Sequence, residues 1–198
     1  MSVFIPRAQG DIAALIAAHP LAWIVSNGPA GFVSTPLPLL AECDGEGRVV
    51  ALFGHFAKRN PHVAALEADP RAAILFQGAE GYVSPRLVSN PTWGPTWNYA
   101  VVRFETEVVF VPDETPSAVE RLAAHLEGTR PGAWTVAEMG ARAVPMLEHI
   151  VAFRAWVLSE QATFKLGQDE SAQTFAEIVE RRPNAALADA MRGAARKE

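Results

Sequence analysis

Apolar and polar residues alternate most clearly near the middle of the chain, over residues 100–110. From Ala100 to Phe110 the even-numbered side chains are apolar or threonine, whereas Arg103, Glu105 and Glu107 occupy odd positions. This period of two predicts a long strand with one buried face and one solvent face.

Two large aromatic residues precede the charged positions on the same side of this strand. Trp97 and Tyr99 share the parity of the charged residues, and Asn98 lies between them. Aromatic residues in strands usually pack within a sheet, which is the plain interpretation. The alternative is that a ligand, a loop or a second chain covers them, because exposed aromatic surface of this size is uncommon.

The same patterns predict further strands and helices on both sides of the central strand. Strands are expected over residues 21–26, 32–40, 48–53, 71–77 and 150–158. Helices are expected over residues 12–19, 62–68, 115–127, 145–149, 172–181 and 185–192. Short turns between the first three strands indicate antiparallel pairing, and six strands are enough to close a small barrel. The sequence therefore predicts a mainly β protein of the α+β class.

Composition narrows the function classes. The chain has 198 residues, 49% of them hydrophobic and 20% charged, which suits one domain with a sizeable core or a domain with an appendage. The net charge of −5 does not favour binding to nucleic acid, which needs a concentrated basic face.

Cysteine usage and the N-terminus bear on the compartment. Cys43 is the single cysteine, so no internal disulfide can form, as is usual in a reducing compartment. The N-terminal residues show no charged-then-apolar signal pattern, and no apolar run approaches the ~20 residues of a membrane span. We therefore expect a soluble cytoplasmic protein.

One stretch has the local chemistry of an anion site. Asn60 suits the N-cap of the helix predicted to follow, and Pro61 suits its first turn. Lys58 and Arg59 then stand beside a helix N-terminus, where backbone N–H groups and the helix dipole also favour a phosphate or carboxylate. The alternative is a solvated basic loop. An anionic, planar aromatic ligand would suit both this loop and the aromatic segment at residues 82–99.

Motifs of other chemistries are lacking in the sequence. Ser84 has no Gly-x-Ser-x-Gly context, and there is no Gly-x-Gly-x-x-Gly dinucleotide fingerprint. The five histidines have no zinc-binding spacing. Hydrolase and metalloenzyme interpretations are therefore weak.

Several blocks, taken in order and with their spacing, resemble one family over nearly the whole chain. The blocks are Phe4-Ile5-Pro6, Leu37-Pro38-Leu39-Leu40, Gly54-His55-Phe56-Ala57-Lys58-Arg59-Asn60-Pro61, Phe76-Gln77-Gly78, Tyr82-Val83-Ser84-Pro85, Pro95-Thr96-Trp97-Asn98-Tyr99, Met146-Leu147 with Ile150-Val151, and Phe164-Lys165-Leu166-Gly167-Gln168. Together they resemble the PaiB-like family of FMN-binding negative regulators of transcription.

The resemblance implies a split β-barrel of the FMN-binding type with C-terminal helices. It implies a barrel domain over residues 1–160 and a helical extension over residues 161–198 that packs on the barrel or on a partner subunit. It also implies a homodimer with FMN near the subunit interface. The residues implied at the phosphate are Lys58, Arg59 and Asn60, with Thr35 and His55 close by. Those implied along the remaining wall are Trp97, Asn98, Tyr99, Lys165 and Gln168.

The chain departs from the family pattern at six positions. The family usually has His at Pro36, Trp-Tyr at Leu87-Val88, and Lys, Ser and Asn at Thr163, Gly167 and Asp169. Several of these changes remove polar or cationic groups and one adds a negative charge, so we expect them to lower affinity for FMN.

Three functions follow as hypotheses. The first is an FMN-binding protein with oxidoreductase activity, in which flavin supplies the redox chemistry. The second is a flavin-responsive or DNA-binding repressor, although the basic clusters are limited to Arg181-Arg182 and residues 192–197 and no helix-turn-helix is evident. The third is a haem-binding or haem-degrading relative that uses His19, His55 or His149 as axial ligand.

Overall fold

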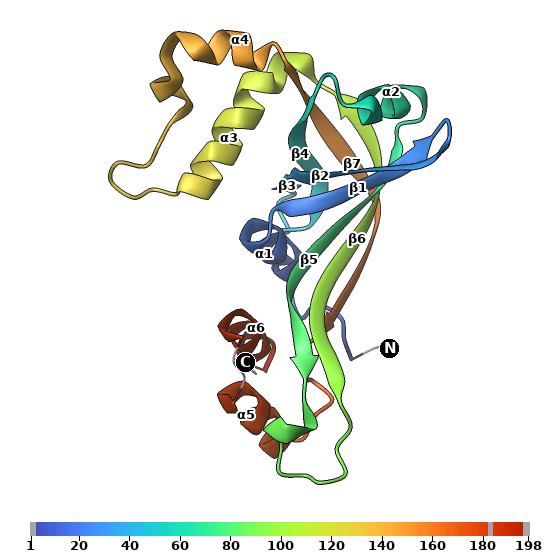
Figure 1. The fold of residues 1–198 in the computed structure, drawn as a ribbon, viewed down its shortest axis with the longest axis vertical. Helices are drawn as coiled ribbons and strands as arrows, with labels where there is room; N and C mark the ends of the chain where they lie inside the picture. Colours follow the sequence, from blue (N-terminus) through green and yellow to red (C-terminus); the bar gives the residue numbers. More distant parts are fainter. Residues whose placement is uncertain (1–2, 182–183, 196–198) are drawn as a thin grey trace.

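The computed structural model describes residues 3–181 and 184–195, and a seven-stranded antiparallel sheet dominates it (Figure 1). The strand order is β2-β1-β5-β6-β7-β4-β3. The strands are β1 (Leu21–Gly28), β2 (Gly31–Pro38), β3 (Leu40–Cys43), β4 (Val49–Ala57), β5 (Arg71–Val83), β6 (Thr96–Phe110) and β7 (Ile150–Lys165). The sheet curls so that β2 also contacts β4, which closes the barrel end of the molecule.

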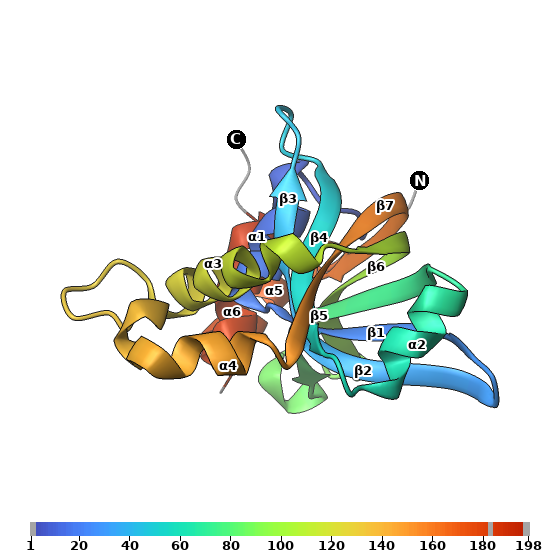
Figure 2. The ribbon, with the colours of Figure 1, turned by 90° about the horizontal axis from the view of Figure 1, so that it is seen from above.

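Helices lie on several sides of this sheet (Figures 1 and 2). The α-helices are α1 (Gly10–Ala18), α2 (Pro61–Ala68), α3 (Thr115–Glu127), α4 (Ala143–Leu147), α5 (Ala172–Arg181) and α6 (Ala185–Ala195). Short 3-10 helices are η1 (Pro85–Leu87), η2 (Pro112–Glu114) and η3 (Val136–Arg142). The segment from η2 to α4 projects away from the barrel, whereas α5 and α6 lie at the opposite end of β5, β6 and β7. The predicted α+β class is confirmed.

The buried face of β6 is the one that the alternation predicted. Ala100, Val102, Phe104, Thr106 and Val108 are buried, and the odd-numbered charged residues face outward. The core that these residues join also contains aromatic side chains of the neighbouring strands, with the rings of β4 Phe56 and β7 Phe153 4.9 Å apart.

β5 and β7 are longer than predicted because each contains a β-bulge that shifts its alternation. Thr106 of β6 lies opposite Val157 of β7, and Glu105 of β6 lies opposite Ser159 of β7. Leu158 of β7 is therefore an extra residue without a partner in β6. A comparable irregularity lies between Gln77 and Glu80 of β5. A bulge reverses which parity faces the core. The alternation of apolar and polar residues that predicted this strand therefore ends at Leu158. The strand itself continues to Lys165 and crosses the predicted domain boundary at residue 160.

The far ends of β5, β6 and β7, over residues 79–99 and 161–168, form an extension that we call the arm. α5 and α6 pack on one face of the arm around a second apolar cluster. Its buried members are Val83, Val88, Leu166, Ile178, Leu187 and Met191, and Leu87 packs against them.

Gly167 allows this layer to pack closely. Its φ of +89° is one that residues with a Cβ rarely adopt, and a Cβ there would lie 3.1 Å from Met191 Cε and 3.2 Å from Phe175 Cδ2. The departures from the family pattern at Leu87, Val88 and Gly167 therefore lie where the C-terminal helices pack.

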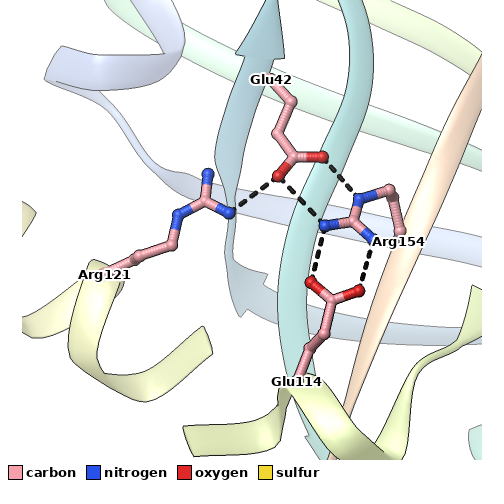
Figure 3. A network of polar contacts seen from close by, with 4 residues as sticks. All are labelled: Glu42, Glu114, Arg121 and Arg154. Carbon is pink, nitrogen blue, oxygen red and sulfur yellow. Dashed lines mark hydrogen bonds and ion pairs between the residues drawn. The ribbon is translucent and has the colours of Figure 1, made fainter. Parts of the chain in front are cut away.

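A partly buried ion-pair network fastens the η2–α3 segment to the barrel (Figure 3). Arg154 of β7 binds both oxygens of Glu42 (2.5 and 3.2 Å) and both oxygens of Glu114 (2.8 and 2.9 Å). Arg121 of α3 reaches the same Glu42 at 2.8 Å, and both guanidinium groups lie over the ring of Phe53 at 4.6 and 4.8 Å. The hydrogen bond to Arg154 lowers the pKa of each glutamate, so both stay charged at neutral pH.

A second polar network joins α2 to β1 and β2. His62 is fully buried, and its ring nitrogens lie 2.9 Å from Ser26 Oγ and 2.9 Å from Thr35 Oγ1. Asn60 donates from Nδ2 to Thr35 Oγ1 at 3.3 Å and accepts the His62 N–H at 3.0 Å. Burial lowers the pKa of His62, which keeps the ring neutral at pH 7.

Replacing Arg154 should destabilise the protein markedly. In Arg154→Met, Glu42 and Glu114 lose their shared partner, and we expect the free energy of unfolding to fall by about 2 kcal/mol, below the range for fully buried pairs because the glutamates reach solvent. Urea unfolding at pH 7 measures this. The control is Arg192→Ala, which removes the exposed pair with Asp189 and should cost less than about 1 kcal/mol. Equal losses in the two variants would contradict the prediction.

His62 should make stability depend on pH. Its folded pKa is below the unfolded value of about 6.5, so as the pH falls below 6.5 the unfolded chain gains a proton that the folded chain resists. The free energy of unfolding should therefore decrease from pH 7.5 to pH 5.5, and less steeply in His62→Gln. Burial lowers the pKa of His55 as well, so part of the slope should remain. Urea unfolding at both pH values tests this, with exposed His149→Gln as control. An unchanged slope in His62→Gln would exclude the assignment.

Candidate functional site

A pocket of about 480 Å³ lies between α2 and the ends of β6 and β7 where the projecting segment begins. We call it the α2 pocket. Lys58 and Arg59 of the β4–α2 loop line it, and its apolar part includes Val63, Phe110 and Val151. Pockets of this size and largely apolar lining are typical of small-molecule sites.

The positive charges at this pocket are not neutralised by the protein. The side chains of Lys58 and Arg59 are exposed and form no hydrogen bond or ion pair with any residue that the structure describes. Arg71, by contrast, is held by Asp69 at 2.8 Å. Two uncompensated cations beside an apolar surface favour a ligand with a phosphate or carboxylate group.

The N-terminus of α2 contributes less to this site than the sequence suggested, because Asn60 accepts hydrogen bonds from the backbone N–H groups of its first turn. The N–H groups of His62 and Val63 bind the side chain and carbonyl of Asn60 at 3.0 Å each. Asn60 N–H binds Ala57 O at 2.9 Å, and Pro61 has no N–H. The attraction for an anion therefore comes mainly from the Lys58 and Arg59 side chains.

Thr35 and His55, the other residues implied near the phosphate, lie in the same region. Thr35 is held by His62 and Asn60, so it supports the loop from beneath. His55 pairs with Ala152, next to Val151 of the pocket. Its Nδ1 is buried and has no hydrogen-bond partner among the described residues, and burial lowers its pKa.

The second predicted group lies on the arm. Trp97 is 51% exposed, its ring lies 6.1 Å from that of Tyr82, and its indole N–H donates to Glu80 at 2.5 Å. Tyr99 pairs across strands with Lys165, whose ammonium group donates to Thr96 Oγ1. Trp97 and Tyr82 therefore form an exposed aromatic surface flanked by charged residues.

Asn98 and Gln168 are engaged within their own chain. Asn98 is 1% exposed, and its Nδ2 lies 3.5 Å from the sulfur of Met191 on α6. Gln168 accepts the N–H of Leu166 at 2.7 Å and donates to Phe164 O at 2.5 Å. In the single chain the Asn98 amide contacts α6, and the Gln168 amide connects residues at and just after the end of β7.

The two groups of predicted residues do not share a cavity in one chain. Phe110, in the α2 pocket, and Trp97 lie at opposite ends of β6, which at about 3.3 Å per residue places them roughly 40 Å apart. Lys58, Arg59 and Asn60 line the α2 pocket, and Thr35 contacts Asn60. The remaining group lies on the arm, at the other end of the long strands from α2 (Figure 1).

The chemistry of the α2 pocket fits FMN. Unpaired Lys58 and Arg59 suit its phosphate, and the apolar surface at Val63 and Phe110 suits its ring system. The buried, unpartnered Nδ1 of His55 is a further polar atom in this region. The residues present could therefore hold this cofactor.

Sequence reasoning did not assign seven of the residues that line the pocket, which are Pro61, Val63, Ala64, Glu67, Phe110, Pro112 and Val151. Phe110, Pro112 and Val151 reach it only through tertiary packing, which no local signal reveals. Glu67 could have been found, because it follows Asn60 by seven residues on the predicted helix and so shares its face.

The histidines considered as haem ligands lie on separate elements. His19 follows α1, His55 is on β4, and His149 precedes β7. Among the residues described, no group of three or more His, Cys, Asp and Glu side chains is arranged to hold a metal ion. Within that same part of the chain no helix has the length and apolar character needed to cross a membrane.

Comparisons with known proteins agree with this chemistry. A family profile described as "Putative FMN-binding domain" matches residues 2–158. The chain is 28% identical over 139 residues to "Protease synthase and sporulation protein PAI 2" of Bacillus subtilis strain 168. That match covers 67% of this chain and 65% of the relative, so slightly under two thirds of the relative is spanned.

Solved structures with low sequence identity share the fold. The FAD and heme binding protein from Mycobacterium smegmatis has a TM-score of 0.62 and 18% identity, over 89% of this chain and 79% of that chain. The conserved hypothetical protein Rv2991 from Mycobacterium tuberculosis has a TM-score of 0.60 and 16% identity, over 87% of this chain and 95% of that chain.

These findings confirm the PaiB-like resemblance, the split-barrel fold and FMN as the cofactor. The profile ends at residue 158, so α5 and α6 lie beyond the matched region. Because the match covers far more than half of the sequence, the chain belongs to the family of FMN-binding domains that this profile describes.

Proposed function

We propose that this protein is a dimeric FMN-binding redox protein in which each flavin contacts both subunits. The α2 pocket of one chain holds the phosphate end, and the arm of the second chain covers the flavin ring. One observation carries this proposal. The unpaired cations Lys58 and Arg59 lie far from the exposed rings of Tyr82 and Trp97, and most of the length of β6 separates the two groups. A second copy supplies the missing half of each site.

The outer face of the sheet supports association of two chains. Trp23 on β1 pairs across strands with Leu75 on β5, and both side chains are exposed. Phe32 at the β1–β2 turn is 86% exposed. Exposed apolar surface of this kind is typical of protein interfaces.

The residues of the chain would bind and orient the cofactor. Lys58 and Arg59 compensate the phosphate charge, and Phe110 with Pro112 keeps water from one side of the pocket. Tyr82 and Trp97 provide flat surfaces against which a planar ring can stack. Bound FMN supplies the capacity to accept and donate electrons.

Direct DNA binding receives no support from the described surface. Arg192 pairs with Asp189, and the guanidinium group of Arg181 donates to Leu87 O. Arg182, Arg196 and Lys197, also part of the predicted basic clusters, lie outside the described residues. Haem binding remains the alternative cofactor hypothesis, and a titration that follows both the flavin and the Soret absorbance separates the two.

Removing the pocket cations should weaken FMN binding. In Lys58→Ala/Arg59→Ala the phosphate loses two charge-assisted contacts, so the Kd should rise about 100-fold. Flavin fluorescence titration measures this change. The control is Arg130→Ala, which removes an exposed cation of the projecting segment that pairs with Glu127. Wild-type affinity in the double variant, or no FMN uptake by the wild type, would refute the proposed site.

Mixing two variants that bind FMN poorly should restore FMN binding if each site is formed by both subunits. Lys58→Ala/Arg59→Ala lacks the cations and Trp97→Ala lacks the indole, so each alone should bind FMN poorly. After unfolding and refolding together, half of the dimers are mixed and each has one intact site, so about a quarter of all sites should recover. Flavin content of the dimer fraction from size-exclusion chromatography reports this. No recovery would show that both groups act within one chain or not at all.

A further inference from the structure

Glu67 lies at the opposite end of the α2 pocket from the two cations. One face of α2 lines the pocket, with Asn60 at its start and Glu67 seven residues later. At about 1.5 Å per residue, these positions are roughly 10 Å apart along the helix axis. Val63 and Ala64 lie between them on the same face, so the charged ends of the pocket are separated by apolar surface.

The opposite charges at this pocket do not neutralise one another. Glu67 forms no ion pair or hydrogen bond with a described residue through its side chain, and neither do Lys58 and Arg59. The pocket therefore has a positive end and a negative end, both available to a ligand. A carboxylate accepts hydrogen bonds and donates none, so it favours hydroxyl or N–H groups and repels a second anion.

We propose that Glu67 is a ligand-binding residue that selects for hydrogen-bond donors about 10 Å beyond the phosphate. This inference rests on the proposed function. FMN has hydroxyl groups along its ribityl chain and an N–H group on its ring, and either can donate to Glu67. A ligand with a second negative group at this depth would be rejected.

The roles of the two ends can be separated with two ligands. Riboflavin has the ribityl chain and ring of FMN but lacks the phosphate. Lys58 and Arg59 act on the phosphate, so Lys58→Ala/Arg59→Ala should weaken FMN and leave riboflavin nearly unchanged. Glu67 acts beyond the phosphate, so Glu67→Gln should weaken both ligands by a similar factor, about tenfold for the loss of one charge-assisted hydrogen bond.

The experiment is a fluorescence titration of FMN and riboflavin against wild type, the double variant, Glu67→Gln and Glu67→Ala. Exposed Glu120→Gln on α3 is the matched control, and circular dichroism checks that each variant is folded. A parallel loss for both ligands in both Glu67 variants supports the proposal.

Three results would overturn it. Unchanged affinity in the Glu67 variants would show that the carboxylate does not contact the ligand. Tighter FMN binding with unchanged riboflavin binding would show that Glu67 only repels the phosphate. If the wild type binds neither ligand, the proposed function fails together with this inference, whereas the first two results leave the proposed function standing.

Discussion

The hydrogen bonding of β6 to β5 on one side and to β7 on the other is the constraint on which the rest of the structure depends. β6 pairs with β5 from Thr96 to Glu107 and with β7 from Tyr99 to Phe110. One end of this ladder provides Phe110 of the α2 pocket, and the other carries Trp97. Because a strand is nearly inextensible, the distance between pocket and arm is fixed by the length of β6.

The networks and helices attached to the β5–β6–β7 ladder hold different parts of the structure in place. The Arg154 network fastens the projecting segment next to Pro112, and the His62 network fastens α2 beneath the cationic loop. The C-terminal helices α5 and α6 pack on the arm at Asn98 and Gly167. Two residues implied as cofactor contacts have partners within the single chain, Asn98 at Met191 and Gln168 at Phe164 and Leu166, and their role at the cofactor stays a prediction.

Sequence reasoning succeeded where neighbours in the chain are also neighbours in space. The faces of β6 follow directly from alternation, and Lys58 and Arg59 beside the Asn60 cap are a local arrangement. It failed where long-range packing decides the outcome. Phe110 and Val151 meet at the α2 pocket only after β4, β6 and β7 pair, and the donors of α2 were occupied by the same Asn60 that marked the helix start. Gly167 stands where the family usually has Ser, so the sequence suggested that a polar group had been lost. In the structure, Met191 and Phe175 occupy the space around Gly167.

The single extra residue at Leu158 also accounts for a change of inward parity along β7. Before it, Phe153 and Ala155 point into the barrel, and after it Ala162 and Phe164 do so, so the inward parity changes from odd to even. Deleting this residue would leave a regular strand in which Val157 stays opposite Thr106 and Ser159 stays opposite Glu105. Phe164 and Lys165 would therefore keep their sides of the sheet, but the bend and the added twist that a bulge gives a strand would be lost. The bulge thus sets the direction in which the arm leaves the barrel, and a deletion at this position should reorient the arm without exchanging the faces of β7.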